Sequence, residues 1–158
     1  MKHLLSFLIV LSLLFAISLN VNATQKSIQS SEATQIEFFD DGSCLIITIN
    51  EENTCTTFST QTKSGTKTLS YKDADGNVEW KVVLHGTYTY TGTTSTCTSA
   101  NITYNIYDTN WVMESATASK SANTAIGDIV AKRKVLGITV NTISNQITLS
   151  CSPTGVLS

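Results

Sequence analysis

The stretch Val78–Tyr90, VEWKVVLHGTYTY, decides the fold class of this chain. Apolar and aromatic residues alternate with polar ones over the eleven residues from Trp80 to Tyr90. This period of two is typical of a strand in an antiparallel sheet that has one buried and one exposed face. Gly86 interrupts the apolar face, which predicts a bulge or a close backbone approach at that position.

The rest of the chain repeats short alternations of this kind, separated by polar turns. A polar segment with a glycine separates two alternating stretches at three places: residues 40–43, 73–77 and 91–94. Each of these segments predicts a hairpin turn. Further strands are expected at residues 111–119 and 124–135. The alanines of residues 116–131 make a helix the alternative there, although the Ser, Thr, Asn and Gly content of this segment disfavours one.

The C-terminal part is expected to form two more strands, residues 136–142 and 146–151, around a turn at residues 144–145. Residues 51–63 are rich in Thr, Asn, Gln and Ser and are interpreted as a connecting loop. Short, evenly spaced strands without an amphipathic helix predict an all-β protein. We expect an antiparallel, immunoglobulin-like β-sandwich of roughly 7–9 strands, although the Cys, Trp, Cys order of true immunoglobulin domains is not reproduced.

The first 23 residues have the features of a secretory signal peptide. Lys2 and His3 precede the apolar run LLSFLIVLSLLFAISL, and small or modest residues stand at 21–23, where a signal peptidase would cut. We therefore expect a signal peptide over residues 1–23, a flexible tail over 24–33 and a single β-sandwich domain over 34–158. The predicted localisation is secreted, and a retained N-terminal anchor is the alternative.

Charge limits the classes of partner. Removing Lys2 from the ten basic residues leaves nine against twelve acidic ones, a net charge of about −3. Nucleic acids and anionic membranes attract basic surfaces, so we expect no nucleic acid partner and no stable membrane insertion after signal cleavage. The one basic cluster, residues 132–134, is interpreted as an exposed sheet edge or a solvated face of a strand.

Four cysteines, Cys44, Cys55, Cys97 and Cys151, predict a disulfide framework in an exported chain. Three pairings are possible. We favour Cys44 with Cys55 and Cys97 with Cys151, because the first two share the N-terminal unit and the second two flank the C-terminal half. A zinc site is the alternative, disfavoured because no C-x-x-C pair is present and His85 is remote from every cysteine. No metal or cofactor is expected.

The sequence gives no complete catalytic constellation. His85 is the only histidine after the signal peptide, it lies mid-strand on the polar face, and no G-x-S-x-G elbow accompanies it. The carboxylate pairs at residues 40–41 and 73–75 are interpreted as turn residues rather than as a glycosidase pair. Residues 73–77 also resemble the opening of a calcium loop, but the distal Glu is missing. We therefore assign no catalytic residue.

Exposed aromatic side chains could stack on sugar rings. Trp111 and Tyr107 are interpreted as the surface pair, and the other tyrosines are assigned to the interior. With His85 these two are the candidate ligand contacts. We expect a non-enzymatic module for surface adhesion or ligand binding, with an extracellular partner such as a glycan or cell-surface component. A small secreted hydrolase using Asp73, Asp75 or His85 and a toxin-like effector are the alternatives.

Three segments carry a resemblance to a known family: GTYTYTGTTSTCTSANITYNIYD, SATASKSANTA and TLSCSPTGVLS. Over about residues 66–158 the chain resembles small exported proteins of Gram-positive, clostridia-like bacteria, described only as a domain of unknown function. The resemblance implies an extracellular bacterial β domain in which Cys97 and Cys151 are the shared pair. Cys44 and Cys55 lie outside the shared part, and no catalytic residue is implied.

Overall fold

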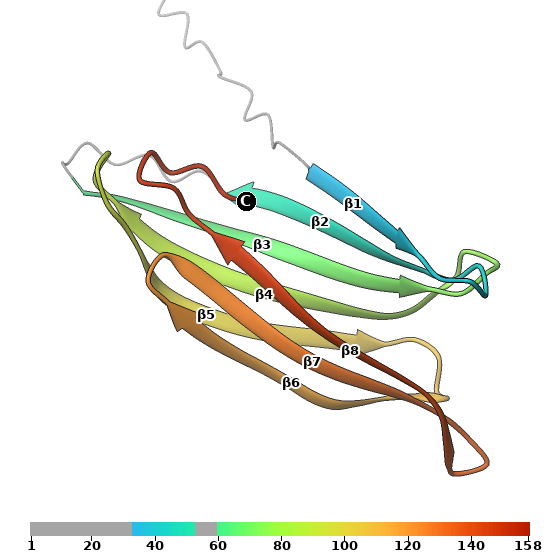
Figure 1. Cartoon of the computed structure of the whole chain (residues 1–158). Helices are drawn as coiled ribbons and strands as arrows, with labels where there is room; N and C mark the ends of the chain where they lie inside the picture. The colour runs from blue at the N-terminus through green and yellow to red at the C-terminus, as the bar shows by residue number, and fades with distance from the viewer. Residues whose placement is uncertain (1–32, 53–59) are drawn as a thin grey trace, which may run out of the picture.

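The computed structural model describes residues 33–52 and 60–158, which fold into eight antiparallel strands in two sheets (Figure 1). The larger sheet has the strand order β1-β2-β3-β4-β5 and the smaller one has the order β6-β7-β8. The larger sheet comprises β1 (Ala33–Phe38), β2 (Cys44–Glu52), β3 (Gln61–Lys72), β4 (Val78–Tyr90) and β5 (Ser95–Ile106). The smaller sheet comprises β6 (Trp111–Ser121), β7 (Thr124–Val135) and β8 (Ile138–Ser150).

The expected all-β class and antiparallel sandwich are confirmed. The two sheets pack face to face around Trp80, Val82 and Leu84 of the interior strand β4, all fully buried. The strands of each sheet follow the order of the chain, whereas an immunoglobulin domain uses Greek-key connections. The immunoglobulin-like connectivity is therefore not confirmed.

Several sequence predictions lie outside the residues that the structure describes. They are the signal peptide over residues 1–23, the tail up to residue 32, and the partner thiol Cys55. Ala33, assigned to the tail, is the first residue of β1. The described ranges contain no helix long and apolar enough to cross a membrane. The helix left open over residues 116–131 is not formed, because these residues lie in β6 and β7.

The close approach predicted at Gly86 is made by an aromatic ring. A Cβ atom at Gly86 would lie 2.2 Å from the hydroxyl oxygen of Tyr88, so no other residue fits under that ring without a shift. The Tyr88 hydroxyl donates a hydrogen bond to the carbonyl oxygen of Leu149, at 2.5 Å. Tyr88 therefore ties β4 of the larger sheet to β8 of the smaller one, and a bulge in the β4–β5 pairing falls between Thr87 and Tyr88.

The C-terminal hairpin differs from the prediction. Residues 144–145 do not form a turn: Ser144 pairs with Val130 and Asn145 with Ile129, so β8 is one continuous strand. The turn lies instead at Leu136 and Gly137, which both have positive φ. Glycine adopts this left-handed conformation without steric cost, which suits Gly137 to the turn.

The segment expected as a loop over residues 51–63 is partly strand, since β2 continues to Glu52 and β3 begins at Gln61. Lys63 is buried and donates to the carboxylate of Glu51, with 2.6 Å between Nζ and Oε2. The other carboxylate oxygen of Glu51 accepts the backbone amide of Leu157, at 3.0 Å. The end of the chain is thus fastened to the β2–β3 pair, as Figure 1 shows.

Candidate functional site

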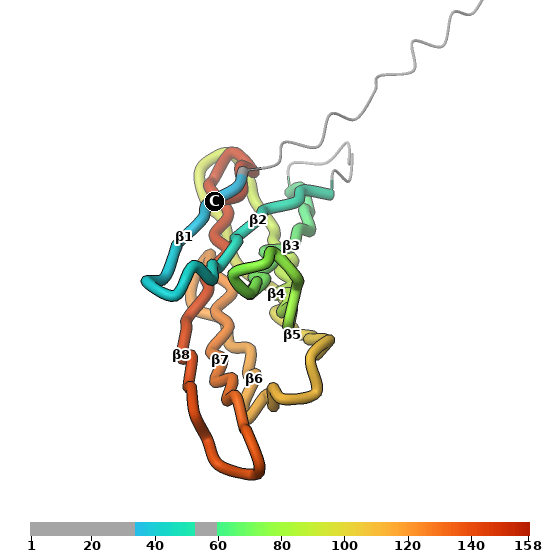
Figure 2. The backbone as a smooth tube through the Cα atoms, turned by 90° about the vertical axis from the view of Figure 1, so that its right-hand side faces the viewer, coloured from blue at the N-terminus to red at the C-terminus, as the bar shows by residue number. Residues whose placement is uncertain are grey.

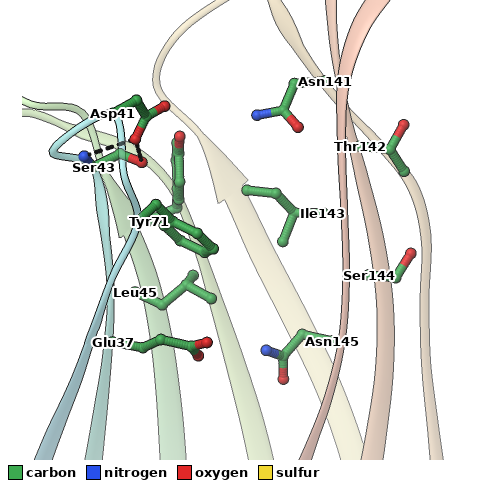
Figure 3. Close-up of a pocket in the computed structure, with 11 residues that line it drawn as sticks. Glu37, Asp41, Ser43, Leu45, Tyr71, Asn141, Thr142, Ile143, Ser144 and Asn145 are labelled. Carbon is green, nitrogen blue, oxygen red and sulfur yellow. Dashed lines mark hydrogen bonds between the residues drawn. The ribbon is translucent and has the colours of Figure 1, made fainter.

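The smaller sheet does not cover the whole inner face of the larger one. Its strands pack on β3, β4 and β5, and residues 34–38 of the edge strand β1 stay exposed, whereas Leu45 of β2 is buried. A pocket of about 280 Å³ lies between this edge and β8 (Figure 3). Its lining residues come from β1, the β1–β2 turn, β2, β3 and β8: Glu37, Phe39, Asp41, Ser43, Leu45, Tyr71 and residues 141–145.

Strand β8 forms one wall of the pocket. Asn141, Ile143 and Asn145 point toward the opposite wall, whereas Thr142 and Ser144 point away from it (Figure 3). This alternation follows from the pleat of the strand, which sends successive side chains to opposite faces. Two amide groups flanking one apolar side chain therefore face the cavity from this side.

The opposite wall carries two carboxylates, Glu37 of β1 and Asp41 of the β1–β2 turn. The Asp41 Oδ1 atom accepts hydrogen bonds from the Ser43 hydroxyl at 2.5 Å and from the Ser43 backbone amide at 3.0 Å. These two bonds hold the pKa of the Asp41 carboxyl below its usual range. Asp41 is therefore a fixed negative charge at the rim of the pocket.

Aromatic rings lie at the base of this wall. The Tyr71 ring stacks on Trp80 with 5.5 Å between ring centroids and 12° between planes, and it meets Phe39 at 6.2 Å. Burial raises the pKa of the Tyr71 hydroxyl, so this group stays a neutral donor and acceptor. Phe39 and Tyr71, together with Leu45 and Ile143, give the pocket an apolar floor.

Sequence reasoning missed this pocket as a site. It interpreted Asp41 only as a turn residue, and the structure shows that the turn also presents its carboxylate to the cavity. Most of the other lining residues are ordinary members of alternating strands, and Phe39 and Ser43 lie in the same turn as Asp41. They become neighbours only because β8 packs opposite β1–β3, and a single sequence carries no direct signal for that packing.

The three predicted ligand contacts do not come together. His85 is exposed on the outer face of β4, with its Nε2 3.4 Å from the Thr103 hydroxyl. Tyr107 is 58% exposed in the β5–β6 connection, as expected of a surface residue. Trp111 is only 2% exposed, so its assignment to the surface is wrong. Tyr104, assigned to the interior, is 49% exposed because β5 is an edge strand.

The burial of Trp111 has a physical cause in β4. Tyr71 pairs with Trp80 and Lys72 with Val78, which leaves Glu79 as an extra residue in a bulge. The bulge makes Glu79 a buried residue, and its Oε2 atom accepts the indole Nε1–H of Trp111 at 2.5 Å. The Trp111 ring also packs edge-on against Trp80 and Tyr71.

Cys44, Cys97 and Cys151 are buried free thiols in this structure, so the predicted Cys97–Cys151 disulfide is not seen. The two residues nevertheless flank one turn: the Cys97 amide donates to Ala122 O at 2.8 Å and the Cys151 amide to Asn123 O at 3.0 Å. Burial raises the pKa of the Cys97 thiol, and the Cys151 thiol adds to that rise. The pairing with Cys55 falls outside the described residues.

The other candidate carboxylates serve turns. Both oxygens of Asp73 accept from Asn77, at 2.7 Å from its backbone amide and at 3.0 Å from its side chain. Over residues 33–52 and 60–158, no group of three or more acidic, histidine or cysteine side chains could hold a metal ion. In the basic cluster, Lys132 pairs with Glu114 at 2.6 Å.

The site therefore has to be interpreted from its own geometry. It consists of two carboxylates, two amides and a tyrosine hydroxyl around an apolar floor, in a pocket suited to one small ligand. The resemblance to exported bacterial β domains remains a prediction. No protein-family description, curated protein or solved structure matches this chain.

Proposed function

We propose that this protein is a secreted, non-enzymatic binding module, and that the pocket between β1–β3 and β8 holds a hydroxyl-rich ligand of the saccharide class. The observation that carries the proposal is the composition of the pocket. Glu37 and Asp41 offer acceptors, Asn141 and Asn145 offer both donors and acceptors, and the aromatic floor offers an apolar surface. Hydroxyl groups on an apolar ring are complementary to such a set.

The same geometry favours binding over hydrolysis. Asp41 already accepts two hydrogen bonds from Ser43, which fixes its charge and lowers the basicity that proton transfer would need. His85 lies on the outer face of the larger sheet, away from the lining residues. A pocket that orients polar groups without an activated nucleophile is suited to recognition.

Export through the signal peptide at residues 1–23 is part of this proposal. In an oxidising compartment we expect Cys97 and Cys151 to pair, their two protons and two electrons passing to a thiol–disulfide oxidant of the export pathway. The positions of both cysteines beside the β6–β7 turn support that pairing. Alkylation of the protein recovered from the medium tests it: labelling of Cys97 should require reductant in addition to denaturant.

The binding proposal is tested on the mature protein with a glycan array, followed by titration of the best saccharide. Replacing both Asn141 and Asn145 by Ala should weaken binding roughly ten-fold or more, because two hydrogen-bonding amides are lost. Asn105→Ala is the matched control, since this exposed amide lies on β5 away from the pocket and should leave affinity unchanged. Binding to no saccharide, or equal loss in the control, would overturn the proposal.

A further inference from the structure

The tip of the β7–β8 hairpin gathers exposed apolar side chains. Every residue over 133–142 is exposed, and the hairpin projects past the rest of the sandwich (Figure 2). We use the name apolar tip for the four large side chains at its end: Val135, Leu136, Ile138 and Val140. Leu136, at the apex, is 97% exposed to solvent.

The backbone at the apex is unfavourable for the residue that occupies it. Val135 pairs with Ile138, so Leu136 and Gly137 form a two-residue loop, with φ of 50° and 81°. Positive φ at both positions defines a type I′ turn, which favours Asn followed by Gly. A leucine there carries backbone strain and exposes its side chain to water, so folding alone does not account for it.

Basic residues lie directly below the apolar tip, at Lys132, Arg133 and Lys134. Lys132 pairs with Glu114, whereas the ion pairs of the described ranges do not include Arg133 or Lys134. The charge of Arg133 also acts on Asp41 of the pocket. The whole chain is slightly acidic, but screening over about 8–10 Å makes the local charge decisive at this end of the molecule.

We propose that the β7–β8 hairpin docks the protein on an anionic lipid surface. The apolar tip enters the boundary between headgroups and acyl chains, and Arg133 and Lys134 bind the lipid phosphates. A protein partner would have to supply a pocket shaped for this narrow, convex tip and a broad contact around it, whereas a bilayer accepts such a tip without a shaped cavity. The contact is peripheral and does not depend on the saccharide pocket.

The test is co-sedimentation of the mature protein with phosphatidylcholine vesicles, with and without phosphatidylglycerol. We expect binding to the anionic vesicles that weakens as salt is raised. Leu136→Asn should weaken vesicle binding roughly ten-fold or more, because the variant no longer transfers a leucine side chain from water into the bilayer. Lys134→Gln should weaken it roughly five-fold, the contribution of one cation near an anionic surface.

Two features of the design keep the result interpretable. Asn before Gly is the favoured type I′ pair, so Leu136→Asn should fold at least as well as the native chain, and lost binding cannot come from unfolding. Val156→Asn is the matched control, because Val156 is also exposed and apolar but lies past the C-terminal end of β8, where its carbonyl oxygen accepts the Ser152 amide, and the tip lies at the other end of that strand. It should leave vesicle binding unchanged.

Four results would overturn the proposal. In the first, the native chain sediments with neither vesicle. In the second, it binds neutral and anionic vesicles equally. In the third, Leu136→Asn binds as the native chain does. In the fourth, analytical ultracentrifugation finds a dimer that Leu136→Asn dissolves while vesicles bind nothing, which would make a second copy of this chain the occupant of the tip.

Discussion

The hydrogen bond between Trp111 and Glu79 can be tested with a pair of matched substitutions. Trp111→Phe and Trp80→Phe delete the same indole atoms from two neighbouring buried rings, whose centroids lie 6.1 Å apart. The lost burial and the cavity should cost about 1–3 kcal/mol in either variant. Only Trp111→Phe also removes a donor from a buried carboxylate, since Trp80 Nε1 has no hydrogen-bond partner in the described part of the chain.

The difference between the two variants therefore reports the hydrogen bond, together with the relief of the unpaired donor that Trp80→Phe removes. A hydrogen bond to a charged group contributes about 1.5–3 kcal/mol, so Trp111→Phe should have the lower free energy of unfolding by about that amount. With a urea dependence of about 1–3 kcal/mol/M, its midpoint should lie about 1 M below that of Trp80→Phe. Urea unfolding followed by far-UV circular dichroism measures both midpoints without relying on tryptophan fluorescence.

Glu79→Gln completes a double-mutant cycle with Trp111→Phe. The amide oxygen of the glutamine still accepts from the indole, so Glu79→Gln alone should cost less than Trp111→Phe, and the two substitutions should not be additive. Equal midpoints for Trp111→Phe and Trp80→Phe, or additive effects in the cycle, would show that the bond does not stabilise the fold. The burial of Trp111 would then need another explanation.

Three further outcomes are expected. Leu136→Asn should raise the thermal midpoint by relieving about 1 kcal/mol of left-handed strain, and a lower midpoint would contradict the turn assignment. Gly86→Ala should destabilise by about 1–3 kcal/mol in urea, because its Cβ would meet the Tyr88 ring, and an unchanged midpoint would contradict that contact. Hydrogen bonds from Asn77 lower the pKa of Asp73 in the folded chain, so the ionised carboxylate stabilises the fold. This contribution is present above the unfolded pKa and is lost as pH falls below about 4. Asp73→Asn should therefore reduce the loss of unfolding free energy at acid pH, and an unchanged loss would contradict the role of Asp73.

The fold class could be predicted because local rules and tertiary packing agree over most of the chain. The alternation in β4 matches its buried face, and Gly42, Gly76 and Gly92 have positive φ in the turns where glycine was expected to supply it. The β6–β7 strands were also located correctly despite their alanine content. Each of these features depends on residues close together in sequence, which is the range over which pattern and propensity are informative.

The errors occur where a local rule is broken. The β7–β8 turn was misplaced because Leu136 stands where Asn is favoured, so the chain lacked the usual signal at the true turn. Trp111 was assigned to the surface because the other aromatic residues are in phase with core positions. Its burial depends on the bulge in β4, which turns the Glu79 carboxylate inward to meet the indole. The pocket was missed because no segment contains more than one wall of it.

Strand β8 shows how structure and recognition divide along one element. Its C-terminal half carries Ile147 and Leu149, both buried, and Leu149 accepts the Tyr88 hydroxyl across the sandwich. Its N-terminal half carries exposed residues at the apolar tip and then the amides of the pocket wall. Because burial provides most of the stability, substitutions before residue 146 should disturb binding much more than folding. Both proposed binding surfaces include residues of that half, so a folded variant that fails to bind is the informative result for either of them.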